Sequence, residues 1–284
     1  MNSYIRTLRL PGLHQEIDWL WGQRQTCFSG HYPFKIFPDK ELKQVDFAPI
    51  TLFYGSNGSG KSTLLNITAE LSKAKRHSVF SPGAFFAEYL AMCELSSYRL
   101  PECEIITSDD VFEYLLDIRS LNNGIDRQRE ALFDEFATRK YQSHRLASLD
   151  DYDDWKESLD AKRMTRSHFV NERLRKNEKM GSNGESAFSY FIERIEDGKV
   201  YLLDEPENSL SVSRQIELCT HIHDAARFFG CQFIIATHSP IFLGMEDALI
   251  YDLDSIPCRV KKFEELENVR SWFFFFEQHR EKFL

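Results

Sequence analysis

Short apolar runs alternate with longer amphipathic segments along much of the chain, as strands alternate with helices. Three runs have strand length and are apolar on both faces: 50–54 (ITLFY), 200–203 (VYLL) and 233–236 (FIIA). One helix is predicted over 62–76, after a short loop that follows the first run. Another is predicted over 211–229, between the other two runs. Strands that are apolar on both faces are typical of a parallel sheet covered by helices. The pattern therefore predicts an α/β fold with a mostly parallel core sheet flanked by helices.

The segment between the first run and the second differs in character. Residues 127–180 carry charges of both signs and few large apolar groups after Tyr141, as a solvated helical arm would. After Gly181 the composition becomes that of a globular core again. We predict a single domain over residues 1–284 with an inserted helical lid or arm subdomain over 75–180.

Composition narrows the class of protein. Of the 284 residues, 42% are hydrophobic and 14% aromatic, which excludes wholesale disorder and a fibrous protein. The formal charge of −9 disfavours a dedicated nucleic-acid binder, although the basic segment 162–179 leaves room for a local nucleic-acid groove. The six cysteines form no CxxC pair, so reduced cysteines and a cytoplasmic location are expected. No stretch reaches the ~20 apolar residues of a bilayer span, so no membrane association is expected, and the aromatic segment from Phe273 onward is interpreted as a packed helix or a partner contact.

The clearest chemical signal is a glycine-rich loop between the first predicted strand and its helix. Residues 55–63 fit the pattern GxxxxGK[ST] in full, with Lys61 and Ser62 at its end. Glycines let backbone N–H groups wrap phosphate oxygens, and the helix adds its positive N-terminal end. Lys61 would reach the outer phosphates, and Ser62 would ligate Mg²⁺. The phosphate-binding residues predicted here are Gly55, Ser56, Asn57, Gly58, Ser59, Gly60, Lys61, Ser62 and Thr63.

Two adjacent carboxylates end the second apolar run. Open α/β sheets place their ligands at the carboxyl ends of their strands, which is where Asp204 and Glu205 fall. Asp204 suits the Mg²⁺ shell, and Glu205 suits a general base that activates water. A turn with two solvated acids is the alternative, but the phosphate loop upstream disfavours it.

A histidine follows the third apolar run. If that strand lies beside the one carrying Asp204, the imidazole of His238 is within reach of a terminal phosphate. A structural, hydrogen-bonding histidine is the alternative. We favour a catalytic role together with Lys61 and Glu205.

A fourth segment, SNGES over 182–186, precedes Asp204 by about 20 residues. It is typical of a helix N-terminus with Ser182 and Glu185 as a capping box. Such a capped terminus is also a phosphate site, and it could serve a nucleotide held by another subunit. The residues assigned to this second nucleotide contact are Ser182, Asn183, Gly184 and Glu185.

In order and spacing these motifs resemble the ATP-binding-cassette ATPases. The loop 55–63 resembles their Walker A motif, 182–186 a degenerate signature, and 202–207 (LLDEPE) Walker B with its catalytic glutamate. Residues 207–211 resemble the D-loop, and His238 the switch histidine. Within that superfamily the chain is most similar to small soluble AAA-type ATPases related to Rad50, SMC and OLD proteins. The resemblance covers roughly 45–70 and 180–255 and implies that two protomers sandwich two Mg²⁺-ATP molecules and separate after hydrolysis.

The chain departs from the family in three ways: in its glutamine loop, in the length of its insertion and in the lack of a clear aromatic residue for adenine stacking. It has no glutamine between residues 64 and 127, where transport cassettes carry their glutamine loop, and Asp109 or Asp110 is the expected substitute near Mg²⁺. The spacing from Lys61 to Gly184 is too short for a long coiled coil. For adenine stacking, Tyr32, Phe34 and Phe37 remain equal candidates.

Four functions are compatible with these residues. The first is a homodimeric ATPase that switches an effector encoded nearby, such as a nuclease or toxin of a bacterial defence system. The second is a DNA-clamping ATPase that uses the basic segment, which requires hydrolysis stimulated by DNA. A transporter subunit is disfavoured by the missing glutamine loop, and a scaffold without turnover is disfavoured by Glu205.

Overall fold

The computed structural model describes residues 3–22, 30–141, 163, 165–174 and 183–283. The chain divides into two compact units, one formed by Met1–Phe112 with Asn183–Leu284 and the other by Glu113–Ser182. The first unit contains both sheets and every site residue discussed below that the structure describes. The two units are described separately.

The main sheet of the first unit has six strands in the order β5-β6-β7-β3-β8-β9. All neighbours pair in parallel except β8 and β9, which confirms the predicted α/β class with a mostly parallel sheet. Its strands are β3 (Ile50–Tyr54), β5 (Cys103–Thr107), β6 (Val200–Asp204), β7 (Gln232–Thr237), β8 (Leu249–Asp252) and β9 (Arg259–Val260). In register, Asp204 of β6 lies opposite Ala236, and Tyr54 of β3 lies opposite Thr237. The carboxyl ends of these three strands therefore share one edge.

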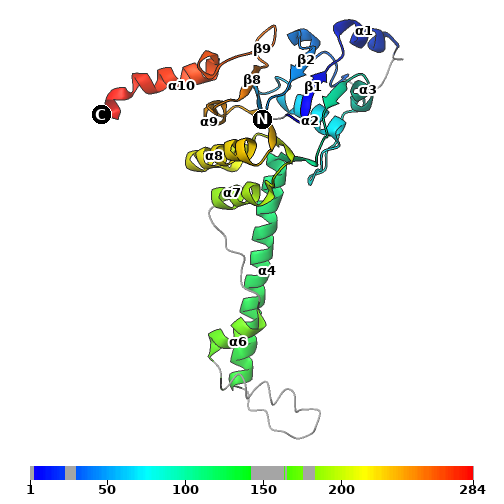
Figure 1. Cartoon of the computed structure of the whole chain (residues 1–284). Coiled ribbons are helices and arrows are strands. Elements are labelled where there is room, and N and C mark those ends of the chain that lie inside the picture. Colours follow the sequence, from blue (N-terminus) through cyan, green and yellow to red (C-terminus); the bar gives the residue numbers. More distant parts are fainter. Residues whose placement is uncertain (1–2, 23–29, 142–162, 164, 175–182, 284) are drawn as a thin grey trace. The chain divides into compact units, whose positions relative to one another are not determined.

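The helices of this unit lie around the sheet in Figure 1. Helix α2 packs on β6 and β7, α8 packs on β7, and α7 lies against α8. In Figure 1, α10 extends away from the strands. The helices are α1 (Leu13–Gly22), α2 (Lys61–Ser72), α3 (Phe86–Ala91), α7 (Asn183–Arg194), α8 (Val212–Phe228), α9 (Pro240–Leu243) and α10 (Glu267–Gln278), with 3₁₀ turns η1 (Pro38–Lys40), η3 (Pro206–Ser209), η4 (Phe263–Glu265) and η5 (Arg280–Lys282).

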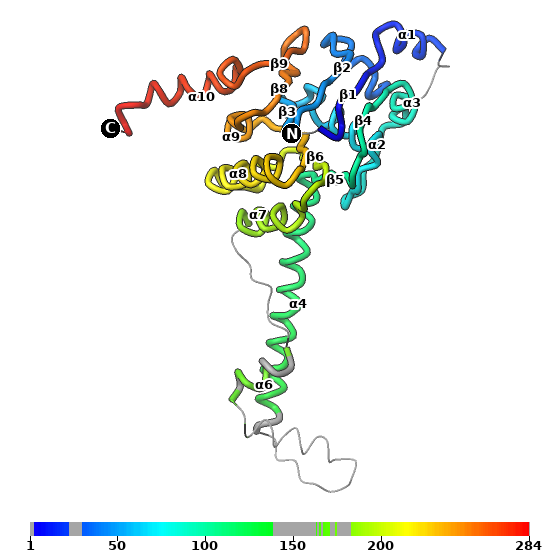
Figure 2. The backbone as a smooth tube through the Cα atoms, viewed as in Figure 1, coloured from blue at the N-terminus to red at the C-terminus, as the bar shows by residue number. Residues whose placement is uncertain are grey.

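A second, antiparallel sheet in the order β2-β1-β4 completes the unit and can be followed as a tube in Figure 2. Its strands are β1 (Ile5–Arg9), β2 (Gln44–Asp46) and β4 (Glu94–Ser97). Buried Gln232 of β7 joins the two sheets, because its amide accepts from the backbone N–H groups of Tyr4 and Ile5 and donates to the carbonyls of Ile5 and Ala48. A buried amide with all of these bonds made is well satisfied and fixes one sheet on the other.

The second unit consists of part of a long helix and a short one. Helix α4 (Ser108–Tyr141) continues into this unit, where Phe136 packs against Phe169 and Val170 of α6 (Arg166–Arg173). The unit begins at Glu113 and not at residue 75, because β4 and β5 are strands of the two sheets. Of the basic segment 162–179, the structure describes residue 163 and residues 165–174.

Candidate active site

The loop 55–63 connects β3 to α2, and its shape depends on glycine at two positions. A Cβ on Gly55 would lie 2.4 Å from Ser59 Oγ, and one on Gly60, whose φ is +99°, would lie 2.9 Å from a methyl of Ile36. Both contacts are closer than real Cβ atoms allow, and L-residues avoid the backbone conformation of Gly60. The glycines at these positions therefore permit the tight turn that faces backbone N–H groups toward a ligand.

Lys61 is almost wholly buried, with its ammonium turned back over this loop. Its Nζ donates to the carbonyl oxygens of Gly55, at 2.8 Å, and Ser56, at 3.2 Å, and lies 3.8 Å from Glu205 Oε1. A buried cation with two carbonyl acceptors is fixed in place. The loop thus presents a positive charge at its mouth.

The loop fits a phosphate-bearing ligand on two further observations. The hydroxyl of Ser59 is buried and has no hydrogen-bond partner among the described residues, so a ligand oxygen would satisfy it. Asp254, just after β8, accepts from the backbone N–H and the hydroxyl of Ser56 and fixes the start of the loop. Sequence reasoning missed Asp254, because an acid in the turn after a strand is no distinctive signal.

Ser62 and Asp204 form the oxygen pair predicted for a metal ion. Ser62 Oγ donates to Asp204 Oδ1 at 3.0 Å. Burial, together with nearby Glu205 and Glu207, raises the pKa of Asp204 to about 6, although Ser62 and Lys61 act in the opposite direction. No group of three His, Cys, Asp or Glu residues within the described ranges could hold a metal. Mg²⁺ commonly binds through one or two protein oxygens and substrate phosphates, so these two donors suit it.

Glu205 lies directly after Asp204 in a left-handed conformation, with φ 48° and ψ 55°. Its backbone N–H donates to Ala236 O at 2.8 Å, and Asn208 Nδ2 donates to its Oε2 at 3.0 Å. Its other oxygen lies 3.7 Å from His238 Nδ1. A positive φ at a non-glycine residue stores strain, which clusters at functional sites. The carboxylate is thus held between Lys61 and His238.

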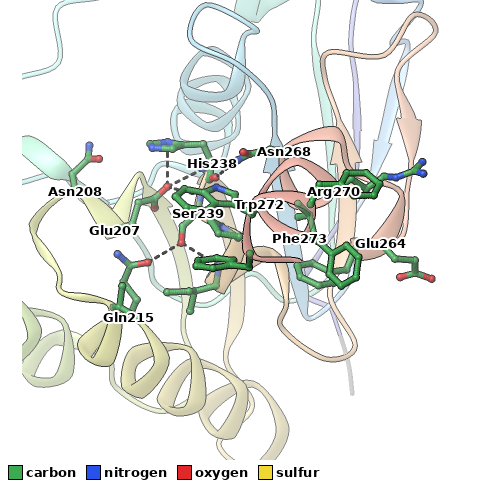
Figure 3. Close-up of a pocket in the computed structure, with 17 residues that line it drawn as sticks. Glu207, Asn208, Gln215, His238, Ser239, Glu264, Asn268, Arg270, Trp272 and Phe273 are labelled. Atoms are coloured by element: carbon green, nitrogen blue, oxygen red, sulfur yellow. Dashed lines mark hydrogen bonds and ion pairs between the residues drawn. The ribbon is translucent and has the colours of Figure 1, made fainter. Parts of the chain in front are cut away.

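Glu207 organises the end of β7, which sequence reasoning did not foresee. Its buried Oε1 accepts from Thr237 Oγ1 at 2.7 Å and from the backbone N–H groups of His238 and Ser239 at 2.8 and 3.1 Å. His238 Nδ1 lies 3.3 Å from the same oxygen. Figure 3 shows the contacts of Glu207 with His238 and Ser239, beside Gln215. The carboxylate therefore fixes where His238 leaves the strand.

The expected substitute for the glutamine loop lies at the start of α4. Asp110 is buried and accepts from the N–H of Ser78 and from the N–H and hydroxyl of Thr107, so its carboxylate is committed to holding the loop. Asp109 is exposed. Because Thr107 lies opposite Asp204 in the sheet, Asp109 follows that edge by two residues and stays a candidate for the metal shell.

The signature-like segment forms the first turn of α7. A Cβ on Gly184 would lie 3.7 Å from both Ser209 O and Ser211 N, so the helix start packs closely on the loop that follows Glu207. Glu185 forms a 3.6 Å ion pair with Arg214 of α8. Ser182 lies outside the described residues.

Of the three aromatic candidates for adenine, one remains accessible. Phe34 and Phe37 are buried core residues, with Phe34 stacked on Trp19 at 4.2 Å. Tyr32 is 45% exposed, and its hydroxyl lies 2.9 Å from Thr63 Oγ1 at the start of α2. The structure thus leaves Tyr32 as the candidate beside the loop.

Comparison with protein families identifies the chain. A family model described as "AAA domain, putative AbiEii toxin, Type IV TA system" matches residues 94–244, just over half of the chain. The chain belongs to this family. The match confirms the predicted relationship to ABC- and AAA-type P-loop ATPases. It includes Asp204, Glu205 and His238, while the P-loop precedes the matched range and is placed against them by the structure.

Solved structures with low-level similarity to this AAA-domain protein include two SMC heads. The head domain from Pyrococcus furiosus, bound to the C-terminal domain of ScpA, is 15% identical over 98% of this chain and 99% of that one, with a TM-score of 0.42. The head domain from Thermotoga maritima is 15% identical over 88% and 94%, with a TM-score of 0.37. A putative metal-chelate type ABC transporter is 17% identical over 79% and 76%, with a TM-score of 0.39. These values add nothing to the family match.

Two further features of this AAA-domain protein are absences. No match was found among curated proteins. Within the described ranges, no helix is both long and apolar enough to cross a membrane.

Proposed function

We propose that this AAA-domain protein binds Mg²⁺-ATP at the loop 55–63 and hydrolyses it to ADP and phosphate. One observation carries the proposal: at the ends of β3, β6 and β7, Lys61 and His238 each lie within 4 Å of Glu205, next to the Ser62–Asp204 pair. A cation, a carboxylate base and an imidazole converging beside a phosphate loop are the parts that phosphoryl transfer to water requires.

Each residue has a distinct role in this proposal. Ser62 and Asp204, with Asp109 as a further candidate, hold Mg²⁺, which would neutralise phosphate charge when bound. Lys61 stabilises charge on the outer phosphates, exchanging its contact with Glu205 for one with the ligand. Glu205 accepts the proton of the attacking water, and His238, fixed by Glu207, donates a hydrogen bond to the terminal phosphate.

We further propose that hydrolysis is coupled to a head-to-tail sandwich of two protomers. Ser182, Asn183, Gly184 and Glu185 of one protomer would contact the nucleotide of the other through the N-terminus of α7. The support is local: the start of α7 packs against residues 209–211, so the two segments form one surface. Such a reciprocal contact has the twofold symmetry of an isologous dimer.

For the biological role we propose control of an effector protein encoded nearby, in a bacterial defence system or toxin system. The description of the family as a putative toxin of a toxin–antitoxin system supports this setting. Hydrolysis then serves as a timer that separates the two protomers and changes the state of the effector.

Substitution of the base tests the core of this proposal. Glu205→Gln should lower the rate of phosphate release by about 10²–10⁴-fold while leaving ATP affinity within about threefold. At protein concentrations at which it is a single chain without nucleotide, its solution mass should rise with Mg²⁺-ATP to that of two chains. Glu196→Gln, at an exposed position outside the site, is the matched control and should behave as the wild type. A Glu205→Gln protein that still hydrolyses ATP at the wild-type rate would remove Glu205 from the mechanism.

A further inference from the structure

Helix α10 exposes a run of aromatic residues that the protein does not cover. Residues Trp272, Phe273, Phe274, Phe275 and Phe276 each keep between 45% and 62% of their surface exposed, and Phe283 follows at 73%. Five consecutive residues cover nearly all sides of a helix, since successive side chains are about 100° apart. Large contiguous apolar patches of this kind mark interaction surfaces.

An open groove of about 1180 Å³ lies between α10 and the body of the same unit (Figure 3). Its floor includes Val212 of α8 and Pro240 and Ile241 of α9, and its other wall is the aromatic side of α10. The groove exceeds the usual range of small-molecule pockets, about 300–1,000 Å³. Its size and apolar lining suit large side chains of a protein.

The charged residues of α10 are arranged so that they complement those of a second, antiparallel α10. Arg270, Phe273, Phe274 and Glu277 follow the spacing i, i+3, i+4, i+7 and lie on one face of the helix. If a second α10 lies antiparallel across this face, centred between Phe273 and Phe274, Arg270 of each copy lies opposite Glu277 of the other. In the same alignment Glu267, at the start of α10, lies opposite Arg280, which follows the end of α10. One register therefore places two kinds of oppositely charged pair across the contact.

We propose that α10 is a self-association surface on which a second copy of this chain packs its own α10 in antiparallel orientation. Phe273 and Phe274 lie at the twofold axis, and aromatic side chains of each copy enter the groove of the other. This contact needs no nucleotide and is separate from the proposed ATP sandwich. Between Glu267 and Lys282 the segment carries three acidic and three basic residues, so it lacks the basic excess of helices that bind anionic lipid.

The area available is sufficient for such a dimer. Aromatic side chains bury about 150–250 Å² each, and about half of each of the four that line the groove (Trp272, Phe273, Phe274 and Phe276) is exposed, on the order of 400 Å² per copy. With the groove floor of Val212, Pro240 and Ile241, two copies together bury on the order of 1,000 Å², the lower limit of specific interfaces. The exposed ion pair between Glu277 of α10 and Arg280 of the same chain is weak and does not oppose a rearrangement.

Solution mass without nucleotide tests the proposal, over protein concentrations from about 1 to 100 µM. We expect wild type and Lys61→Ala to reach the mass of two chains, since neither needs nucleotide for this contact. Phe273→Ser/Phe274→Ser should have the mass of one chain and still bind ATP. Trp21→Ser, at an even more exposed aromatic residue on α1, is the matched control and should remain dimeric.

Exchanging the charges of Arg270 and Glu277 tests the proposed register of the two helices. Arg270→Glu and Glu277→Arg should each raise the dimer dissociation constant at least about tenfold, because like charges then face each other. The double variant Arg270→Glu/Glu277→Arg should restore it to within about threefold. A monomeric wild type at 100 µM, a dimer unaffected by the aromatic pair, or a double variant without rescue each overturns the proposal. Wild type that stays monomeric but sediments with phosphatidylserine vesicles assigns α10 to a lipid surface and also overturns it.

Discussion

The edge of the main sheet and helix α10 are opposites in how they meet water. At the sheet edge, a lysine and several carboxylates are buried or half-buried and held by specific hydrogen bonds. On α10, aromatic side chains that would favour a core are left in solvent. Buried charge and exposed apolar surface are both unfavourable in a free protomer. In our proposals both regions gain a ligand that removes this cost: a phosphate and a metal ion at the sheet edge, and a second copy of the chain on α10.

The largest effect is expected from removing the positive charge of Lys61 at the sheet edge. Lys61→Ala leaves Asp204 and Glu205 without their nearby positive charge and removes the group that we propose contacts the phosphates. ATP hydrolysis should fall by at least about 100-fold. Phosphate release and nucleotide affinity measure it, with Lys73→Ala, at the other end of α2, as the matched control. Wild-type hydrolysis by Lys61→Ala would place the phosphates elsewhere.

The next effect concerns the glycine that closes the loop. Gly60→Ala puts a Cβ against Ile36 in a left-handed backbone, and we expect a loss of about 2–3 kcal/mol in the free energy of unfolding, with ATP binding lost as well. Chemical denaturation measures it. Gly124→Ala, where a Cβ meets nothing within 4 Å, is the control and should not destabilise α4. Equal stability of both variants would show that the loop is not tightly constrained.

Much of this edge could be predicted, because its signals are local in sequence. Strand, loop and helix adjoin in 50–72, and Asp204, Glu205 and His238 each directly follow an apolar strand. The pairing of β7 with both β6 and β3 then brings them together. The contacts of Asp254 with Ser56, about 200 positions away in sequence, had no local signal. The same holds for Glu207, because its three hydrogen-bond partners come about 30 residues later in the sequence, after α8.

Helix α10 shows the other limit of sequence reasoning. Its aromatic run was compatible with a packed helix or a partner contact, since an apolar run has the same composition whether neighbours cover it or not. Only the positions of α8 and α9 show that the body leaves the run open. The start of the insertion was misplaced for a related reason, as β4 and β5 are short strands whose partners are distant in sequence.

A smaller effect, on the free energy of unfolding, distinguishes a buried carboxylate whose ionisation is unfavourable from one that is paired with a lysine. Burial raises the pKa of Asp204 to about 6, so ionisation at neutral pH costs stability. Without metal or nucleotide, Asp204→Asn should stabilise the protein by about 1–3 kcal/mol at pH 7.5. The gain should shrink as the pH falls from about 6 toward 4, because Asp204 then becomes protonated in the folded protein and its stability is recovered.

Asp252 provides the matched control for that experiment. Its buried carboxylate accepts from Lys261 Nζ at 2.6 Å, so Asp252→Asn should destabilise the protein. Thermal unfolding of both variants across pH measures the opposite signs. Destabilisation by Asp204→Asn would show that Ser62 and Lys61 already compensate its charge.

The smallest effect concerns the link between the two regions. Asn268, in the first turn of α10, donates from its side chain to His238 O at 3.0 Å and from its backbone N–H to Tyr54 Oη at 3.2 Å. Asn268→Ala removes only the first bond and loosens His238. We expect kcat for ATP hydrolysis to fall about threefold with KM unchanged, because in the proposed mechanism His238 acts on the transition state and not on binding.

Ser271→Ala, one turn further along α10, controls for general damage to the helix, since its hydroxyl bonds only within the helix, to Glu267 O. If α10 were a passive support, both variants would shift the melting temperature alike and leave kcat unchanged. A fall in kcat confined to Asn268→Ala would mean that α10 is coupled, through the side chain of Asn268, to the residue that we propose contacts the phosphate. Binding of a partner to the aromatic surface of α10 would then be able to change the position of His238 and thereby the rate of ATP hydrolysis.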